Sequence, residues 1–504
     1  MAASLSTDMN LSLSPESAWD PLPPDAWNAD AARHLLRRAG WTAQPAAVER
    51  ALREGLPATL ERLFPAVPAC LAQPRQTAVV ADEMLGDAEK IRLAAPEEKR
   101  LLQRDEREKS RTALLDLTLR WLDYAAQPDN SAFAKWTLFL SDIYVVSFEK
   151  VARTPLLYQH FDLLARYALG PAPALTKAVS RSPAMIVYLD LNQNRRGAPN
   201  ENFARELFEL FLLGEGNYSE ADIKEAARAF TGYRLRPPGR EFFFAANQHD
   251  NGRKTVFGRS GPFTGDDVID LAYQQPAAAA FLPHEWVKFY LSDTMLPKAY
   301  LSAIGALWST QGFDLRWIAH RLFGSRLFFA PEFRGEFIKS PVQFYLGLMQ
   351  DLDLNVLPVP RYVINPLRQM GQVLFVPPNV RGWVGGRSWI NSASLAARRA
   401  LVEMLFSPLN EAALNNDELV DIVATRTTGP ATFTVADDRL APLAALPPAV
   451  SAHRLAATLL PAAPGPDFEH ALADYLGSAP KPEYLRRTKR ALISVLQSPE
   501  YQLS

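Results

Sequence analysis

Three carboxylates and a histidine are the side chains of this chain best suited to bind a metal ion. Glu206 and Glu209 lie three positions apart in a segment with helical periodicity, so both are expected on one side of a helix. His249 and Asp250 follow in a predicted loop. The four would supply oxygen and nitrogen ligands to a divalent cation, and Lys254 would hold an anionic group beside it. This pattern predicts a metal-dependent enzyme, most simply a hydrolase.

The same charged residues also have a purely structural interpretation. Glu201, Arg205 and Glu209 follow one another at steps of four, which is typical of a ladder of ion pairs on a helix, while Asn200 is placed to cap that helix. Asp250 and Lys254 would then only tie the loop to the helices. No spacing among these residues is diagnostic of a metal site, so the sequence favours the structural interpretation and keeps the metal site as the alternative.

A second group of candidate residues lies in a glycine-rich loop in the last third of the chain, residues 376–394, the tryptophan loop. Paired tryptophans in such a loop can stack on a sugar or a base, with polar neighbours that bind the ligand's hydroxyl groups. The alternative is that the tryptophans clamp their own loop. No Gly-Lys-Ser/Thr follows, so the loop is not a phosphate loop. The candidate residues are Trp383, Arg387, Trp389 and Asn391.

Glu206 and Glu209 lie in a stretch from Ala198 to Tyr233 whose sequence predicts two amphipathic helices. Apolar residues repeat at helical spacing in both halves, and Gly214 and Gly216 separate them. Ser219, three positions before Asp222, resembles a capping box that opens the second helix. The stretch therefore predicts an antiparallel helical hairpin, followed by a small antiparallel β-excursion that carries the histidine loop.

Composition restricts the class of protein further. The 504 residues are 48% hydrophobic and 22% charged, with a net charge of −1, so no broad basic surface for nucleic acid is expected. One cysteine, Cys70, excludes an internal disulfide and a cysteine-rich metal site. The chain begins without a basic and then apolar leader, and no apolar stretch is long enough to span a bilayer, which predicts a cytoplasmic protein.

Helical periodicity dominates the chain, so the predicted fold class is mostly α, with one multi-helical body and the small β-excursion. We expect a flexible segment over 1–27, a helical core over 28–424, a Pro/Ala/Thr-rich connection over 425–450 and C-terminal helices over 451–504. Residues 96–112 are nearly all charged and predict a projecting helical arm. The basic cluster of Arg33, Arg37 and Arg38 is expected to be solvated or paired with carboxylates.

Four long motifs resemble the bacterial domain-of-unknown-function 1800 family, in the family's order and over nearly the full length. They are PNENFARELFELFLLGEGNYSEADIKEAARAFTGY, HDNGRKTVFG, IKSPVQF and PPNVRGWVGGRSWINSASLAARR. The resemblance implies a helical fold and no settled activity. Relatives commonly carry Trp-His-Asn-His-Phe where this chain has Leu140 to Tyr144, and often a histidine at the position of Phe211. Histidine chemistry at those positions is therefore absent or altered here.

These observations lead to three functional hypotheses. The first is a non-catalytic accessory or scaffold protein that acts with a protein partner. The resemblance implies that relatives are often encoded beside a sulfatase-like domain-of-unknown-function 1501 protein, which makes that protein the expected partner, and that many relatives look exported, so export together with a partner stays open. The second is the metal-dependent hydrolase. The third is a carbohydrate-binding protein that uses the tryptophan loop.

Overall fold

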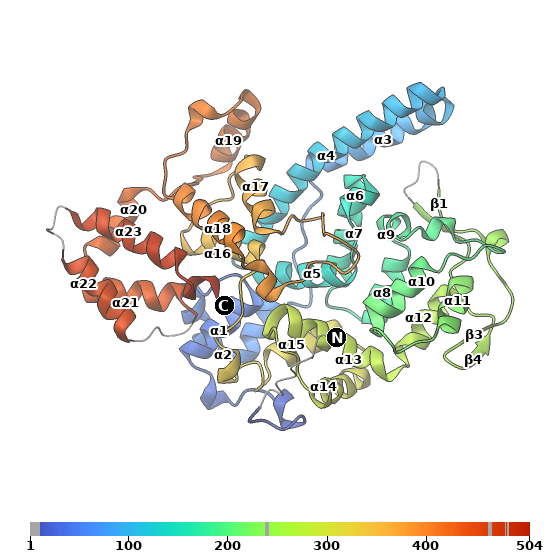
Figure 1. Cartoon of the computed structure of the whole chain (residues 1–504), viewed down its shortest axis with the longest axis horizontal. Helices are drawn as coiled ribbons and strands as arrows, with labels where there is room; N and C mark the ends of the chain where they lie inside the picture. Colours follow the sequence, from blue (N-terminus) through green and yellow to red (C-terminus); the bar gives the residue numbers. More distant parts are fainter. Residues whose placement is uncertain (1–10, 237–240, 462–465, 479, 481–482) are drawn as a thin grey trace.

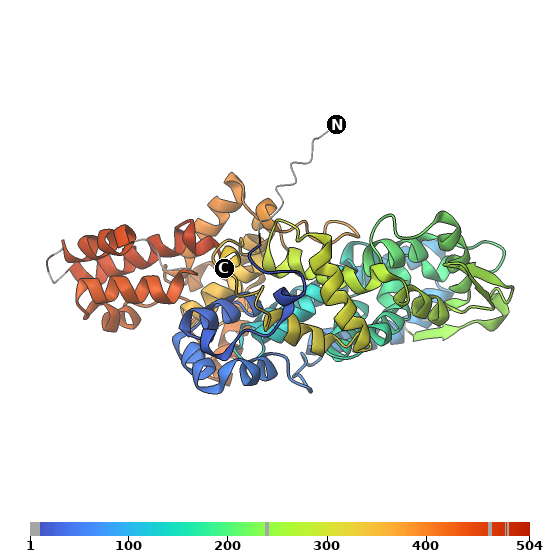
Figure 2. The ribbon, with the colours of Figure 1, turned by 90° about the horizontal axis from the view of Figure 1, so that it is seen from below.

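The computed structural model describes residues 11–236, 241–461, 466–478, 480 and 483–504. Helices form almost all of its regular structure, and the strands make two short antiparallel pairs, so the predicted mostly α fold with a small β-excursion is confirmed. The helices enclose one large hydrophobic core, and the molecule is flattened when it is viewed from its edge (Figure 2). No helix in the described ranges is long and apolar enough to cross a membrane.

The N-terminal part lies against the body from residue 17 onward. Residues 1–10 of the expected flexible segment lie outside the described residues, but the rest differs from that expectation because it contains packed 3-10 turns. Trp19 is fully buried, and its indole N–H donates to the carbonyl of Tyr300 over 2.8 Å. The elements are η1 (Ser17–Trp19), η2 (Pro24–Ala26), α1 (Ala29–Ala39) and α2 (Pro45–Leu63).

Two long helices, α3 (Arg75–Leu93) and α4 (Pro96–Ala126), form an arm that projects from the body (Figure 1). The charged run 96–112, which predicted an arm, forms the outer part of α4. Pro96 begins α4 at a position where its missing N–H costs nothing, and Glu97 and Glu98 stabilise that end. The two helices contact each other through a small apolar cluster of Val80, Met84 and Ala113, which is separate from the main core.

The middle of the body consists of short helices around α5 (Ser131–Ile143), whose residues are almost all buried. Apolar side chains surround this helix because its sequence, SAFAKWTLFLSDI, is apolar on every side. The helices that follow α5 are α6 (Phe148–Val151), α7 (Thr154–Tyr167), α8 (Ala172–Ser180), α9 (Pro183–Tyr188) and η3 (Leu191–Gln193).

The predicted hairpin forms, with one difference in its first helix. That helix begins as α10 (Asn202–Glu206) and continues as the π-helix η4 (Leu207–Leu212), and α11 (Glu220–Ala229) packs beside it. Ser219 and Asp222 make the expected capping box. Gly214 and Gly216 have φ of 79° and 80°, which only glycine adopts without strain.

Two strand pairs follow the hairpin. In the first, β1 (Tyr233–Arg236) pairs with β2 (Glu241–Phe244), so that Tyr233 lies opposite Phe244. In the second, β3 (Lys254–Val256) pairs with β4 (Arg259–Gly261). A 3-10 turn, η5 (Ala246–Gln248), separates the pairs.

The remaining helices complete the body and form a group at one end of the molecule (Figure 1). The expected loose connection over 425–450 instead contains the end of α19 and all of α20, with α21 beginning at its end. The elements are α12 (Gly265–Tyr273), α13 (Pro276–Trp286), the π-helix η6 (Val287–Leu291), α14 (Lys298–Thr310), α15 (Leu315–Phe323), η7 (Pro331–Phe333), α16 (Pro341–Asp351), α17 (Pro360–Met370), η8 (Gly386–Trp389), α18 (Ser392–Leu405), η9 (Glu411–Ala413), α19 (Asn416–Thr428), α20 (Asp437–Ala444), α21 (Pro448–Leu459), α22 (Pro466–Gly477), α23 (Tyr484–Gln497) and η11 (Glu500–Gln502).

Candidate functional site

Three of the four predicted metal ligands have other partners in the structure. Glu209 accepts from Arg381 over 2.6 Å through one oxygen and from the hydroxyl of Tyr218 over 2.9 Å through the other. Glu206 is half-buried and has no ion-pair partner among the described residues; burial, followed by the charge of Glu209, raises its pKa. Among the described residues no three His, Cys, Asp or Glu side chains are grouped so that they would hold a metal ion.

The loop that carries His249 is held to α11 by its own contacts. The ring of His249 is buried, lies 2.9 Å from the carbonyl of Thr231 through Nδ1, and packs against Phe244. Asp250 receives two hydrogen bonds from Arg228, and this pair is the main cause that lowers the pKa of Asp250 to about 2. The geometry matches the structural interpretation of these residues.

The remaining polar candidates of this group also have structural contacts. The ammonium of Lys254 is buried and donates to the carbonyls of Asp250 and Gly252, so it closes the loop on itself. Asn200 accepts from the backbone N–H of Asn202 over 3.0 Å at the start of the hairpin.

The expected charge ladder is only partly formed. Arg205 pairs with Glu201 over 3.2 Å, as the spacing predicts, but its other partner is Glu220 of α11, at 2.7 Å. Glu209 is thereby left for Arg381, 172 positions further along the chain. Arg381 also binds Glu215 over 2.8 Å. This arginine joins the central hairpin to the tryptophan loop, and therefore connects two candidate sites that the sequence presents separately.

The tryptophan loop closes over a cavity of about 70 Å³ beside α5. Aromatic rings form much of its wall, and its floor includes buried polar side chains. Lys135 donates to the carbonyls of Arg38 and Gly40 over 2.8 and 3.0 Å, and burial lowers its pKa well below the usual value. The aromatic wall residues are Phe139, Phe289, Phe337, Trp383 and Trp389.

Asp142, at the end of α5, is a second ionisable group of this cavity with a strongly shifted pKa. Its carboxylate accepts from the backbone N–H of Trp383 over 3.0 Å. Burial raises its pKa to about 7; the Trp383 N–H opposes this shift, while the nearby charge of Glu285 adds to it. A carboxyl that changes its charge near neutral pH is suited to proton transfer or to a pH-dependent contact. The sequence interpretation missed this role, although a lone Asp at the end of an apolar helix was a signal for it.

Two π-helices lie near this cavity. Lys288 of η6 lines it and donates to Glu285 over 2.8 Å, while Glu209 of η4 reaches it only through Arg381, which lines the cavity. An extra residue in a helical turn re-aims the side chains that follow, and such turns are frequent at functional sites.

Polar side chains of the tryptophan loop make hydrogen bonds within the loop and to the start of α18. Asn391 caps α18 in a reciprocal pair with Ser394, whose hydroxyl also donates to the carbonyl of Trp389. The side chain of Arg387 is 90% exposed, with Asp293 at 3.9 Å. A cavity of about 70 Å³ has roughly the volume of two water molecules in the liquid, which is less than a sugar ring occupies. The structure thus resembles a clamped loop more than an open sugar site.

The positions at which the family resemblance implies histidine lie on α5 and η4. Ile143 lines the cavity, and Ser141, two positions earlier, donates its hydroxyl to the carbonyl of Leu138. Phe211 of η4 packs against Tyr144, with 5.4 Å between ring centroids. Apolar contacts and a backbone hydrogen bond therefore occupy the positions at which the resemblance implies histidine.

Comparison with known proteins agrees with the motifs. No curated protein and no solved structure matches this chain. One family model matches residues 34–503, and it is described as a protein of unknown function (DUF1800). Because the match covers nearly all of the 504 residues, and because the helical body with its central hairpin and tryptophan loop lies within it, the chain belongs to the DUF1800 family.

Proposed function

We propose that this protein is a non-catalytic accessory or scaffold protein, and that the α3–α4 arm binds its protein partner. One observation carries the proposal: the arm projects from the body with a row of arginines that pair with no carboxylate among the residues that the structure describes. Arg100, Arg104, Arg107 and Arg111 are four, three and four positions apart on α4, so they lie on one face of the helix.

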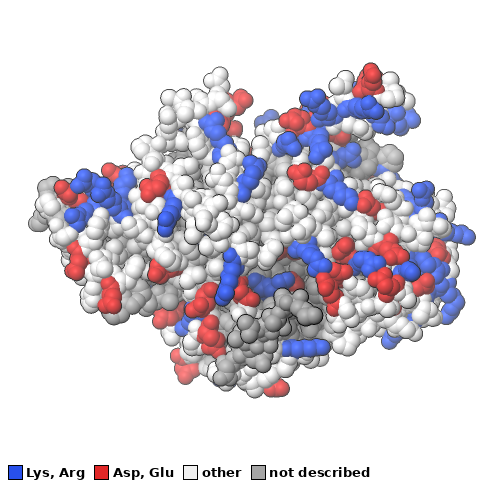
Figure 3. All heavy atoms as spheres, viewed as in Figure 1, with Lys and Arg blue, Asp and Glu red and all other residues white. Residues whose placement is uncertain are grey.

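The four arginines are exposed and form no ion pair within the described part of the chain, whereas several other charged residues of the arm are paired. Lys109, for example, binds Asp105 over 2.9 Å and Glu83 over 3.1 Å. Basic side chains are visible along the arm in Figure 3. Leu93 and Leu101, near the tip, are 69% and 66% exposed. An unpaired basic row beside exposed leucines fits an acidic protein surface with an apolar centre.

The central cavity is consistent with this proposal. The family positions suited to histidine carry Ser141, Ile143 and Phe211, and the carboxylates of the hairpin are bound to arginines or buried. The metal-dependent hydrolase and the carbohydrate-binding protein stay predictions, because no grouping of side chains in the described residues favours them.

The partner that we propose is the sulfatase-like domain-of-unknown-function 1501 protein, on the basis of the family resemblance. The test is co-expression of the full chain with the protein of that class from the same genome, followed by light scattering on the purified mixture. We expect a complex of fixed stoichiometry whose affinity falls as salt rises, since the contact is electrostatic.

A variant with Arg100, Arg104, Arg107 and Arg111 replaced by Ser should bind at least about tenfold more weakly, which corresponds to roughly 1.4 kcal/mol. The matched control replaces four exposed arginines of the body by Ser and should bind like the parent. Equal weakening in both variants, or the absence of any stoichiometric complex, would overturn the proposal. The control positions are Arg196, Arg259, Arg326 and Arg399.

A further inference from the structure

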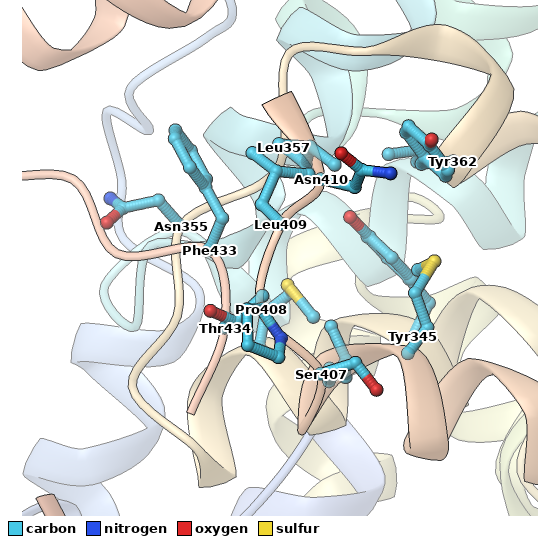
Figure 4. Close-up of a pocket in the computed structure, with 14 residues that line it drawn as sticks. Tyr345, Asn355, Leu357, Tyr362, Ser407, Pro408, Leu409, Asn410, Phe433 and Thr434 are labelled. Atoms are coloured by element: carbon cyan, nitrogen blue, oxygen red, sulfur yellow. The ribbon is translucent and has the colours of Figure 1, made fainter. Parts of the chain in front are cut away.

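An apolar pocket of about 170 Å³ opens between α16, α17 and the end of α18, away from the central cavity (Figure 4). Tyr345 and Met349 of α16 form its buried side, and Met404 lies at the end of α18. The chain segments around Leu409 and Phe433 close the opposite side. The labelled rings of Tyr345, Tyr362 and Phe433 surround the same space in Figure 4.

This pocket exists because two hydrophobic clusters meet there without filling the space between them. Tyr345 and Met349 belong to the main core. Phe433 belongs to a separate cluster with Val359 and Ile422, against which Leu409 packs. The backbone N–H of Asn355 donates to the carbonyl of Thr432, and the side-chain Oδ1 of Asn355 accepts from the backbone N–H of Thr432, both over 2.8 Å. These two bonds tie the outer cluster to the segment that follows α16. The two clusters therefore leave a preformed pocket between them.

The lining selects the chemistry of a ligand. Apolar side chains predominate, and none of the lining residues is Asp, Glu, Lys, Arg or His, so a charged ligand would lose its hydration without gaining a partner. Neutral hydrogen-bonding groups are present in Tyr345, Tyr362 and Asn410. Tyr345 is 2% exposed, and burial raises its pKa, so its hydroxyl stays protonated. Small-molecule sites commonly combine such apolar walls with a few fixed polar groups.

The volume limits the size of the ligand. An engineered apolar cavity of about 150 Å³ in another protein holds one benzene molecule, so about 170 Å³ accommodates one six-membered ring with a small substituent. We propose that this pocket is a binding site for a small, uncharged aromatic molecule, or for the aromatic end of a larger one, that carries one hydroxyl group.

The test uses the full chain labelled with carbon-13 at its methionine methyl groups and titrated with p-cresol. Signals are assigned by single Met→Leu variants. We expect saturable shifts for Met349 and Met404, which line the pocket, while Met84 in the arm and Met185 in the body stay unchanged. No shift at millimolar p-cresol, or equal unsaturable shifts of all methionines, would overturn the proposal.

Two variants and two further probes make the test specific. Leu409→Trp fills the pocket from its rim and should weaken p-cresol binding at least tenfold, whereas Leu307→Trp, at an exposed leucine of α14, should leave binding unchanged. Tyr345→Phe should weaken p-cresol several-fold and leave toluene unaffected, and it decides the question if Leu409→Trp does not fold. 4-Hydroxybenzoate should bind at least tenfold more weakly than p-cresol. Equal binding of the charged probe would refute the assignment to an uncharged ligand.

Discussion

Asp142 shows how one residue can make this fold sensitive to pH. Its carboxyl is half-buried at the end of α5 and accepts from the backbone N–H of Trp383, and burial raises its pKa to about 7. An unfolded Asp loses its proton near pH 4. Between these two values the folded chain holds a proton that the unfolded chain has lost, so the contribution of Asp142 to stability falls as the pH rises through this range.

The Asp142→Asn variant tests this assignment. Asn keeps the oxygen that accepts from Trp383 but carries no charge, so the variant should gain stability relative to the parent by roughly 2 kcal/mol between pH 5 and pH 8. The measurement is urea unfolding of both proteins at each pH. A difference between the two proteins that does not change with pH would show that Asp142 titrates normally.

At the scale of elements, the tryptophan loop depends on glycines that approach carboxylates closely. A Cβ added to Gly382 would lie 2.1 Å from Oδ1 of Asp142 and 3.0 Å from the Asp142 carbonyl, and φ at this glycine is +73°. Gly385 has a similar φ of +78°, but no atom lies within 4 Å of its added Cβ. The two positions therefore separate the cost of the backbone conformation from the cost of the close contact.

We expect Gly385→Ala to destabilise the protein by about 1 kcal/mol, the usual cost of a left-handed backbone for a residue with a Cβ. Gly382→Ala should cost about 1–3 kcal/mol more, because the added Cβ would overlap the carboxylate of Asp142 and press on its backbone carbonyl, so that α5 or the loop would have to shift. Denaturant unfolding of the two variants gives the difference, and a limited protease digest reports whether the loop is released. Equal destabilisation by both substitutions would mean that the loop is not pressed against α5.

At the scale of the whole molecule, the arm and the body have separate cores. Val80, Met84 and Ala113 make the contact between α3 and the outer part of α4, while the inner half of α4 joins the main core through Leu117, Trp121 and neighbouring residues. Because the arm is stabilised by its own small cluster, it adds little to the free energy of unfolding of the body. This favours the proposed binding role of the arm over a structural one.

Replacement of residues 84–109 by a short Gly-Ser turn should therefore lower the unfolding temperature of the body by less than about 3 °C. The same variant should lose the proposed partner, since it lacks Arg100, Arg104 and Arg107. Scanning calorimetry measures the first effect, and light scattering with the partner measures the second. A fall of more than about 10 °C would show that the arm is part of the structural core and would weaken the argument for a docking role.

The sequence by itself determined the local structure of this protein. Helical periodicity predicted the mostly α fold, the glycines at Gly214 and Gly216 predicted the turn of the central hairpin, and Ser219 with Asp222 predicted its capping box, because these signals depend on residues that are close along the chain. The four long motifs likewise sufficed for the family resemblance.

Only the tertiary structure decided which charged groups meet. Arg38, expected to be solvated or paired with a carboxylate, is buried and donates to the carbonyls of Tyr290, Leu291, Phe333 and Ser504, which lie more than 250 positions away. Arg381 binds Glu209 across 172 positions. Such pairings depend on how helices pack, and helical spacing in a sequence carries no information about which distant helix supplies the partner.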